Sequence, residues 1–241
     1  MKKIALVTGA ALRIGKEIAL HLSRNGWKVI IHFNSSTKEA KELAKKISQI
    51  SESLVIQQDL NNIKQINSFF NNIKKQTGTP TLLVNNAAMF VRDDIDVTAE
   101  SLTSHMNVNC FAPILLSQEF AKTSSEEKII INIIDSFANT PTKNYTAYNI
   151  SKTAMLYATK CLALKFPDCR INTISPGMVI EPEEDTEKEI FRKLVKTTHK
   201  HKRTHIDDIL KSIDSILDEG TMNGQNIDLT NKEKVSFRLT F

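Results

Sequence analysis

Three side chains near the middle of the chain have types and spacing suited to proton transfer. Tyr148 is followed four positions later by Lys152 and preceded thirteen positions earlier by Asp135. Positions four apart on a helix share a face, so Lys152 can lie beside Tyr148. A nearby cation favours the phenolate and lowers the phenol pKa from its unperturbed value of about 10. We therefore expect Tyr148 to act as a general acid tuned by Lys152, and Asp135 to restrict the substrate.

The surrounding sequence predicts a sheet with helices on both of its faces. Short apolar runs suited to buried parallel strands alternate with amphipathic stretches at helical spacing. This alternation is typical of an α/β protein with a doubly wound parallel sheet in three layers, αβα. No linker, repeat or low-complexity tract interrupts it, so we expect a single domain over residues 1–241. The expected strands are Lys3–Val7, Trp27–Phe33, Leu54–Gln57, Thr81–Val84, Lys128–Ile134 and Arg170–Ile174, and the expected helices are Gly15–Arg24, Lys38–Ile50, Ile63–Thr77, Leu102–Thr123 and Tyr148–Phe166.

One segment breaks the alternation after the last of these strands. From Met178 to about His205 the chain carries a group of acidic residues, a helical piece and the basic run RKLVKTTHKHKR. Ligands of open α/β sheets bind outside the carboxyl ends of the strands, so an insertion there can cover a bound substrate. We therefore expect a substrate lid around residues 178–205, with the basic run on a solvated helix face or loop.

The loop after the first expected strand has the character of a dinucleotide site. This loop, TGAALRIG (Thr8–Gly15), opens the first helix, and its small residues let backbone N–H groups approach a pyrophosphate there. The second strand leads into HFNSS, which has no acidic residue to bind a ribose 2′-hydroxyl and repel a 2′-phosphate. Asn34, Ser35 and Ser36 can donate hydrogen bonds instead, and Arg13 and Lys38 add positive charge. The pattern predicts NADPH rather than NADH.

Composition sets the broad class. Of the 241 residues 41% are hydrophobic and 24% charged, as in ordered globular proteins. Three cysteines without metal-ligand spacing predict free thiols in a reducing compartment, the cytoplasm. No stretch approaches the ~20 apolar residues of a membrane span, and the short apolar N-terminus fits a strand better than a signal peptide. The net charge of +5 comes without a nucleic-acid-binding signature, so we expect no membrane, nucleic-acid or metal partner.

The motifs, in this order and spacing, resemble those of the short-chain dehydrogenase/reductase family over almost the whole chain. Besides the glycine loop they include Asp59-Leu60, the NNAG-like run Asn85–Ala88, Asn109, the YxxxK pair Tyr148 and Lys152, and Pro176-Gly177. The resemblance implies a Rossmann-type fold, a proton relay steadied by Asn109, and Lys152 holding the nicotinamide ribose. It implies a homo-dimer or homo-tetramer built through the long helices around Leu102–Thr123 and Tyr148–Phe166. The implied cofactor contacts are Gly9, Arg13, Ile14, Gly15, Asn34, Ser35, Ser36, Asp59, Leu60, Asn86, Ala87, Ala88, Tyr148, Lys152, Pro176 and Gly177.

Three departures from the common family pattern resemble the pteridine reductase branch, which includes dihydromonapterin reductases and enzymes that reduce dihydrofolate. Arg13 stands where many relatives have glycine, Asp135 stands where they have the catalytic serine, and Phe90 follows NNAAM directly. By this resemblance Phe90 stacks on a pterin and presses it against the nicotinamide. Arg13 reaches both the pterin and a cofactor phosphate, and Asp135 contacts the ring.

Elementary chemistry agrees with a pterin. A flat, polar heteroaromatic ring suits a facing aromatic side chain and a charged hydrogen-bonding partner. A serine hydroxyl suits a ketone oxygen, which needs a neutral donor as negative charge develops. An aspartate at that place would repel an alkoxide but would accept a hydrogen bond from the protonated nitrogen of a C=N group. We therefore expect NADPH-dependent reduction of a dihydropterin such as dihydromonapterin, dihydrofolate or dihydrobiopterin.

Other interpretations of the same residues stay open at this point. Ser136 could take the role of the usual serine, which would make the protein a carbonyl reductase of, for instance, 3-oxoacyl thioesters. Phe90 could be loop packing, and Arg13 could form only a structural ion pair with Asp59 or a nearby acid. A catalytically silent protein that senses dinucleotides and regulates a partner is a third possibility, against which the intact Tyr148–Lys152 pair argues.

Overall fold

The seven strands form one sheet in which every neighbouring pair is parallel. The structure is a computed structural model, and it describes residues 3–93, 96–125, 127–135, 138, 144–181, 188–189, 191–192, 195–196 and 203–229. The strand order is β3-β2-β1-β4-β5-β6-β7, so the order reverses between β1 and β4. The strands are β1 (Ile4–Val7), β2 (Lys28–Phe33), β3 (Ser53–Gln57), β4 (Leu82–Asn85), β5 (Ile129–Ile133), β6 (Arg170–Ser175) and β7 (Asn226–Asp228).

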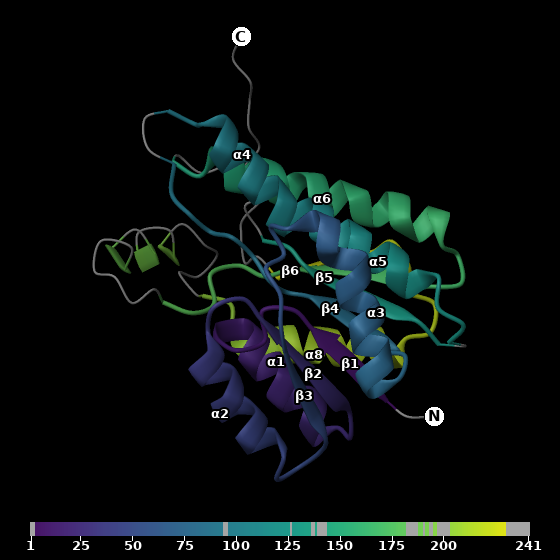
Figure 1. Cartoon of the computed structure of the whole chain (residues 1–241). Coiled ribbons are helices and arrows are strands. Elements are labelled where there is room, and N and C mark those ends of the chain that lie inside the picture. Colours follow the sequence, from purple (N-terminus) through teal and green to yellow (C-terminus); the bar gives the residue numbers. More distant parts are fainter. Residues whose placement is uncertain are drawn as a thin grey trace.

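Helices cover both faces of the sheet (Figure 1). The elements between the strands are α1 (Arg13–Arg24), α2 (Thr37–Ile47), η1 (Ile63–Gln65), α3 (Ile66–Thr77), α4 (Ala99–Met106), η2 (Asn107–Phe111), α5 (Ala112–Ala121), α6 (Thr146–Lys165) and α8 (Ile206–Asp218). One core cluster joins α1, α2 and α8 to one face of the sheet, and a second joins α3, α5 and α6 to the other. Three αβα layers in a single domain are what the sequence predicted.

Alternation along the strands explains why most of their residues are apolar. In β1, Ala5 and Val7 belong to the first cluster, whereas Ile4 and Leu6 belong to the second. Helices cover both faces of the sheet, so the side chains that point to either face are buried. Each strand therefore reads as a largely apolar run. Each predicted strand is found within one or two residues of its predicted ends, and the segment NGQNIDL contains β7. Residues beyond Leu229 lie outside the described residues.

The single helix predicted over Leu102–Thr123 is wrong in its interior. The structure has α4, then a π-helical turn over Asn107–Phe111, then α5. The reason lies in Pro113, the second residue of α5: proline has no N–H to donate to the carbonyl four residues earlier, which belongs to Asn109. A π-helical turn adjusts the helix at such a place, and such turns are frequent at functional sites. The turn matters here because it carries Asn109.

Two further observations concern the part of the chain that the structure describes. None of its helices combines the length and apolar character needed to cross a membrane. Cys110, Cys161 and Cys169 carry free thiols, and Cys110 and Cys169 are buried.

Candidate active site

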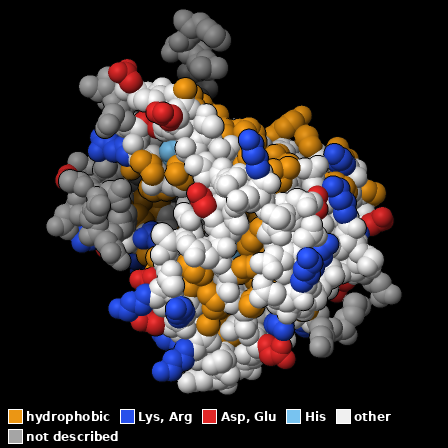
Figure 2. Space-filling view, in the orientation of Figure 1, with side chains coloured by type: hydrophobic (Ala, Val, Ile, Leu, Met, Phe, Trp, Pro, Cys, Tyr) orange, Lys and Arg blue, Asp and Glu red, His pale blue; other side chains and the backbone are white. Residues whose placement is uncertain are grey.

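A large cavity opens at the carboxyl ends of the strands, where the strand order reverses. Its volume is about 1160 Å³, and its lining comes from the loops after β1, β2, β3, β4, β5 and β6 together with the start of α6. Figure 2 shows a hollow in this face of the molecule, and apolar side chains are visible inside it. Every described residue predicted to act in catalysis or to contact cofactor or substrate lines this cavity, except Asn109. The carboxyl ends of parallel strands meet at one edge, which explains how segments far apart in sequence converge.

Two glycines shape the end of the cavity nearest β1. Gly9 has a left-handed backbone, with φ of 62°, and a Cβ atom there would lie 2.8 Å from the Cα atom of Ala87. The Thr8 hydroxyl accepts hydrogen bonds from the N–H groups of Asn86 and Ala87, each at 3.0 Å. The Asn86 amide in turn donates to the carbonyl oxygens of Thr8 and Gly9. The loops after β1 and β4 are thus locked together, with the N-terminus of α1 behind them.

Gly15 leaves no room for a side chain, and Gly15→Ala is expected to lower NADPH affinity at least tenfold. A Cβ at Gly15 would collide with the carbonyl oxygen of Gly9 and lie 2.5 Å from Nδ2 of Asn86. The loop would have to move away from the helix N-terminus that suits a pyrophosphate. Fluorescence titration with NADPH measures the change. Gly220→Ala is the matched control because a Cβ there meets nothing within 4 Å, and equal affinities of the two variants would contradict the prediction.

His32 supports the same loop from β2, and the sequence did not single it out. The Gly9 N–H donates to its Nδ1 atom at 3.1 Å, so Nε2 carries the proton and donates to the carbonyl oxygen of Gln58 at 3.0 Å. Burial lowers the pKa of His32 to about 4, although the Gln58 hydrogen bond opposes the shift. The imidazole is therefore neutral near pH 7 and serves as a fixed support. Its place in β2, directly before the residues predicted to bind ribose, was the available signal.

The loops after β2 and β3 form the far end of the cavity. Asn34, Ser35 and Ser36 line it, together with Asp59 and Leu60. An Asp59 oxygen accepts from the backbone N–H of Asn61 at 2.9 Å. Among the described residues lining the cavity, Asp59 and Asp135 are the carboxylates. The 34–36 segment therefore contributes hydroxyl and amide groups to the lining, without a negative charge of its own.

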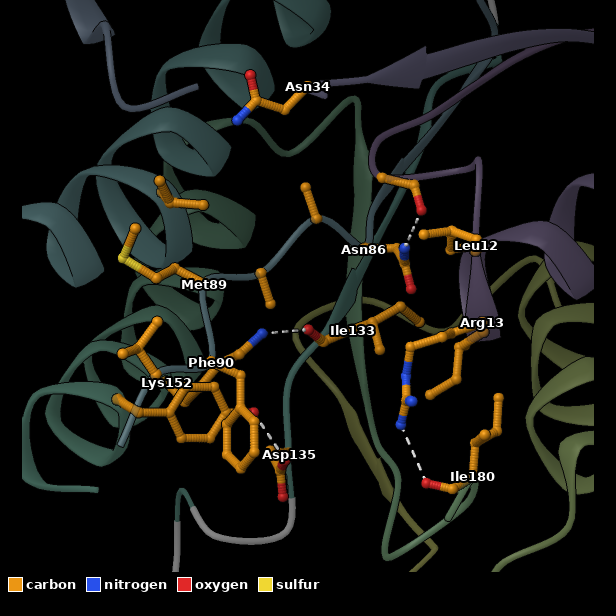
Figure 3. A pocket seen from close by; sticks show the side chains of 18 of the residues that line it. Leu12, Arg13, Asn34, Asn86, Met89, Phe90, Ile133, Asp135, Lys152 and Ile180 are labelled. Carbon is orange, nitrogen blue, oxygen red and sulfur yellow. Dashed lines mark hydrogen bonds between the residues drawn. The ribbon is translucent and has the colours of Figure 1, made fainter. Parts of the chain in front are cut away.

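Arg13 reaches across the cavity mouth. Its guanidinium donates from Nη2 to the carbonyl oxygen of Ile180 at 3.0 Å, and Figure 3 shows both residues opposite Phe90 and Asp135. Among the described residues, no ion pair joins Arg13 to Asp59 or to another acid. The backbone of Arg13 is left-handed, with φ of 51°, which suits glycine better than a side chain. The strain that arginine tolerates here favours a role for its side chain.

Asp135, Tyr148 and Lys152 meet at the other end of the cavity. The Tyr148 hydroxyl donates to Oδ2 of Asp135 at 2.7 Å, while Lys152 donates from Nζ to the carbonyl oxygen of Ile133 at 3.1 Å (Figure 3). Lys152 also lies over the Tyr148 ring, 5.8 Å from its centroid. Tyr148 and Lys152 are 4% and 3% exposed. A phenol, a carboxylate and an ammonium therefore share one secluded corner of the cavity.

The direction of the Tyr148 shift is opposite to the prediction. Burial raises the pKa of Tyr148 well above its usual value of about 10, and the Asp135 carboxylate raises it further by its charge and its hydrogen bond. Burial lowers the pKa of Lys152 to about 8, although Asp135 opposes this. The prediction that Lys152 acidifies the phenol failed because it considered neighbours on the helix and omitted desolvation and the partner across the cavity. Tyr148 is therefore a weaker acid than a free phenol, and it donates a hydrogen bond to Asp135.

An aromatic cluster stands beside the phenol. Phe90 stacks on Tyr145 with ring centroids 4.6 Å apart and planes 6° apart, and it meets Tyr148 edge-on at 4.7 Å. Phe90 is nevertheless 46% exposed, and it lines the cavity. Tyr145 was not predicted to belong to the site. Its spacing could have indicated it, since a residue three positions before Tyr148 at the start of the same helix lies on the same side of that helix.

Asn109 lies just behind the cavity wall in the π-helical turn. Its side chain accepts from the Met89 N–H at 2.7 Å and donates to the Met89 carbonyl oxygen at 2.9 Å and to the Ser151 hydroxyl at 3.0 Å. Asn109 therefore ties the loop that carries Phe90 to α6. Its predicted place in a proton relay stays a prediction.

Two predicted features fall partly or wholly outside the described residues. Ser136, the alternative to Asp135, is one of them. Of the expected lid over residues 178–205, the described ends lie together, because the Thr204 N–H donates to the Met178 carbonyl oxygen at 3.0 Å. Near the first end, Arg192 pairs with Glu181 at 2.7 Å.

A doubly wound parallel sheet, with a glycine loop and a Tyr–Lys pair facing one cavity at its switch point, defines a dinucleotide-binding α/β protein. A family model described as short chain dehydrogenase matches residues 3–190. The chain belongs to this family of nicotinamide-dependent oxidoreductases.

Relatives carry several different names. A short-chain type dehydrogenase/reductase of Picea abies is 33% identical over 193 residues, 73% of this chain and 70% of that protein. Pteridine reductase 1 of Leishmania tarentolae is 26% identical over 228 residues, covering 75% and 78%. An NADPH-dependent aldehyde reductase of Arabidopsis thaliana is 28% identical over 197 residues, covering 73% and 72%. Among solved structures, FolM alternative dihydrofolate reductase 1 from Brucella canis, complexed with NADP, superposes with a TM-score of 0.87 at 27% identity, covering 99% of this chain and 96% of that one.

Proposed function

We propose that this protein reduces a dihydropterin to its tetrahydro form with NADPH, by hydride transfer to a ring C=N bond. The observation that carries the proposal is the hydrogen bond from the Tyr148 phenol to the Asp135 carboxylate, 2.7 Å long, beside the partly exposed Phe90 ring. A carboxylate in this place accepts hydrogen bonds, and a pterin offers N–H groups to it. In the balanced reaction the dihydropterin gains a hydride on carbon and a proton on nitrogen.

The described residues fit a dinucleotide. Gly9 and Gly15 border the loop after β1, and neighbouring atoms approach both so closely that neither position has room for a side chain. The N-terminus of α1 and its free N–H groups favour a pyrophosphate. Asn34, Ser35 and Ser36 would hold the ribose phosphate end, while Lys152, Pro176 and Gly177 would hold the nicotinamide end. When bound there, NADPH supplies the hydride.

Ser35→Asp is expected to reverse the cofactor preference from NADPH to NADH. Ser35 lines the far end of the cavity, where a new carboxylate would bind a ribose 2′-hydroxyl and repel a 2′-phosphate. The ratio of kcat/KM values for the two cofactors is expected to change by about a hundredfold, which corresponds to about 2.7 kcal/mol of differential binding. Steady-state kinetics with each cofactor measure it, with Ser48→Asp, on the exposed end of α2, as the control. An unchanged ratio in Ser35→Asp would mean that the 2′-phosphate lies elsewhere.

The negative charge beside Tyr148 also supports a C=N substrate. A ketone develops negative charge on its oxygen as the hydride arrives, whereas an imine-type nitrogen is basic and accepts a hydride best when it is protonated and positively charged. Asp135 would then stabilise the charge on that nitrogen, where it would repel an alkoxide. The proton would come from Tyr148, Asp135 or water.

Phe90 and Arg13 would bind the two sides of the pterin. Phe90 is 46% exposed and can take a flat ring against it, at a stacking contribution of about 1 kcal/mol beyond area burial. Arg13 lies opposite and would exchange its hydrogen bond with Ile180 for contacts to the substrate and a cofactor phosphate. The likeness to a pteridine reductase and to an alternative dihydrofolate reductase agrees with this arrangement.

The test is an assay of NADPH oxidation with dihydrobiopterin, dihydromonapterin and dihydrofolate against a panel of ketones, aldehydes and 3-oxoacyl thioesters. We expect turnover of the dihydropterins at least a hundredfold above that of the panel. Turnover of the panel alone would establish a carbonyl reductase, for which Ser136 is the candidate donor. Tight NADPH binding without turnover of either group would establish a dinucleotide-sensing protein.

Three accompanying features belong to the proposal. Residues around 178–205 would form a lid, because both described ends of the segment meet at the cavity mouth. The enzyme would work in the reducing cytoplasm, which suits free thiols. It would be a dimer or tetramer through α5 and α6, since Ile150, Tyr157 and Leu164 expose 48%, 70% and 85% of their surface along α6. Light scattering decides the last point, and Leu164→Lys is expected to shift the mass towards the monomer.

A further inference from the structure

Asp93 is a buried carboxylate in the loop that follows β4. It is 6% exposed, and it comes three residues after Phe90 in the same loop. Its Oδ2 atom accepts a hydrogen bond from the N–H of Ala147 at 3.1 Å. Ala147 is the second residue of α6 and directly precedes Tyr148. The carboxylate therefore lies at the N-terminus of the helix that carries the proposed proton donor.

The first turn of α6 needs such a partner. The first N–H groups of a helix have no acceptor within the helix, and a negative charge there is favourable. The N-cap residue of α6 is Tyr145, whose side chain makes no cap hydrogen bond. Asp93 supplies from another loop the hydrogen-bond acceptor that the Tyr145 side chain does not provide. A capping residue distant in sequence joins two segments, whereas an ordinary N-cap stabilises only its own helix.

The backbone of Asp93 repeats the connection. Its N–H donates to the carbonyl oxygen of Asn144 at 2.8 Å, and Asn144 has a left-handed φ of 69°. Main chain and side chain of one residue thus hold residues 144 and 147 together. Between these two points lies Tyr145, the residue on which Phe90 stacks. Oδ1 of Asp93 also accepts from the Ser101 hydroxyl of α4 at 3.4 Å, which fixes the carboxylate from a third side.

We propose that Asp93 is a positioning residue that fastens the Phe90 loop to the first turn of α6. It thereby sets the spacing between the ring that stacks on substrate and the phenol of Tyr148. Asp93 does not line the cavity, so it acts through Phe90, Tyr145 and Tyr148. The kinetic part of this inference rests on the proposed function, and the structural part does not.

The test compares Asp93→Ala and Asp93→Asn with Thr98→Ala. Thr98 caps α4 by accepting from the Ser101 N–H at 3.1 Å, so its loss weakens α4 and the contact from Ser101 to Asp93. It leaves the Asp93 hydrogen bonds to residues 144 and 147 in place, so the comparison isolates those two bonds. Asp93→Ala is expected to lower kcat/KM for the dihydropterin about thirtyfold and to leave the Kd for NADPH within twofold. Asp93→Asn keeps an oxygen acceptor for the Ala147 N–H. Its log(kcat/KM) is expected to recover at least a third of the difference between Asp93→Ala and the parent. Thr98→Ala is expected to keep both values within twofold.

Two readouts are independent of turnover. Hydrogen exchange, followed by mass spectrometry on a peptide covering residues 144–150, is expected to accelerate at least tenfold in Asp93→Ala relative to Thr98→Ala. Near-ultraviolet circular dichroism reports on the same place, because two of the three tyrosines of the chain, Tyr145 and Tyr148, lie in the cluster. We expect the tyrosine signal to fall in Asp93→Ala and to persist in Thr98→Ala.

The outcomes separate this inference from the proposed function. Normal exchange and dichroism in Asp93→Ala would overturn the inference, as would an accelerated exchange with unchanged kinetics. A parent protein that turns over no dihydropterin would refute the proposed function instead. If the parent reduces a ketone instead, kcat/KM for that ketone tests whether Asp93 holds the segment. If the parent reduces no substrate, hydrogen exchange and dichroism provide the test.

Discussion

Asp135→Ser is expected to lose at least a hundredfold of kcat/KM with a dihydropterin and to gain measurable turnover of a ketone. The carboxylate accepts a hydrogen bond from the Tyr148 hydroxyl at 2.7 Å and would accept another from the substrate nitrogen as that becomes charged. Removing one group that stabilises developing charge costs about 10²–10³ in rate. A serine hydroxyl donates instead, which suits an alkoxide and leaves a protonated nitrogen without its counter-charge. NADPH oxidation with both kinds of substrate measures the exchange.

A phenol titration separates the charge of Asp135 from its shape. The carboxylate raises the pKa of Tyr148 by its charge and its hydrogen bond, so Asp135→Asn is expected to lower that pKa while burial keeps it above the usual value. Ultraviolet difference absorption follows the ionisation, and with three tyrosines in the chain the signal can be assigned by comparison with Tyr148→Phe. An Asp135→Asn protein that titrates like its parent and keeps full dihydropterin activity would refute the role of the carboxylate.

The fold could be predicted because local pattern and global architecture agree in this chain. Strands such as Ile129–Ile133 are buried at every position and apolar at every position except Asn132, which only a sheet buried on both faces allows. Helices between them give parallel connections and place the strand ends at one edge. The interior of Asn107–Phe111 could not be predicted, since a π-helical turn depends on a single proline and on the tertiary partners of Asn109, and the helical period across it hardly changes.

The site was predictable in its members and less so in its energetics. Residues at strand ends, such as Gly9 and Asp135, converge wherever the sheet is parallel. The pKa of Tyr148 was predicted wrongly because it depends on burial and on Asp135, whose distance from the phenol no helical spacing gives. His32, Tyr145 and Asp93 were missed for a related reason: each acts through a backbone or ring contact to a segment distant in sequence. Such contacts require the folded loops.

Tyr148→Phe is expected to lower kcat with a dihydropterin by about 10²–10⁴-fold, the usual contribution of a positioned proton donor. The substitution keeps the ring that meets Phe90 edge-on at 4.7 Å and removes only the hydroxyl bonded to Asp135. NADPH binding should therefore stay within a fewfold of the parent value, which fluorescence titration checks. Tyr157→Phe is the matched control, because Tyr157 lies on the same helix and is 70% exposed.

The size of the loss identifies the proton donor. If the phenol delivers the proton, kcat of Tyr148→Phe falls while the substrate KM changes little, because the hydroxyl then acts mainly in the transition state. If Asp135 delivers it, the loss stays below about tenfold, and the remaining activity depends on protonation of Asp135, so it rises as the pH falls. Either dependence would still require Asp135 beside the substrate nitrogen. Full activity in Tyr148→Phe with a flat pH profile would remove the Tyr148–Asp135 pair from the chemistry, and the pterin assignment with it.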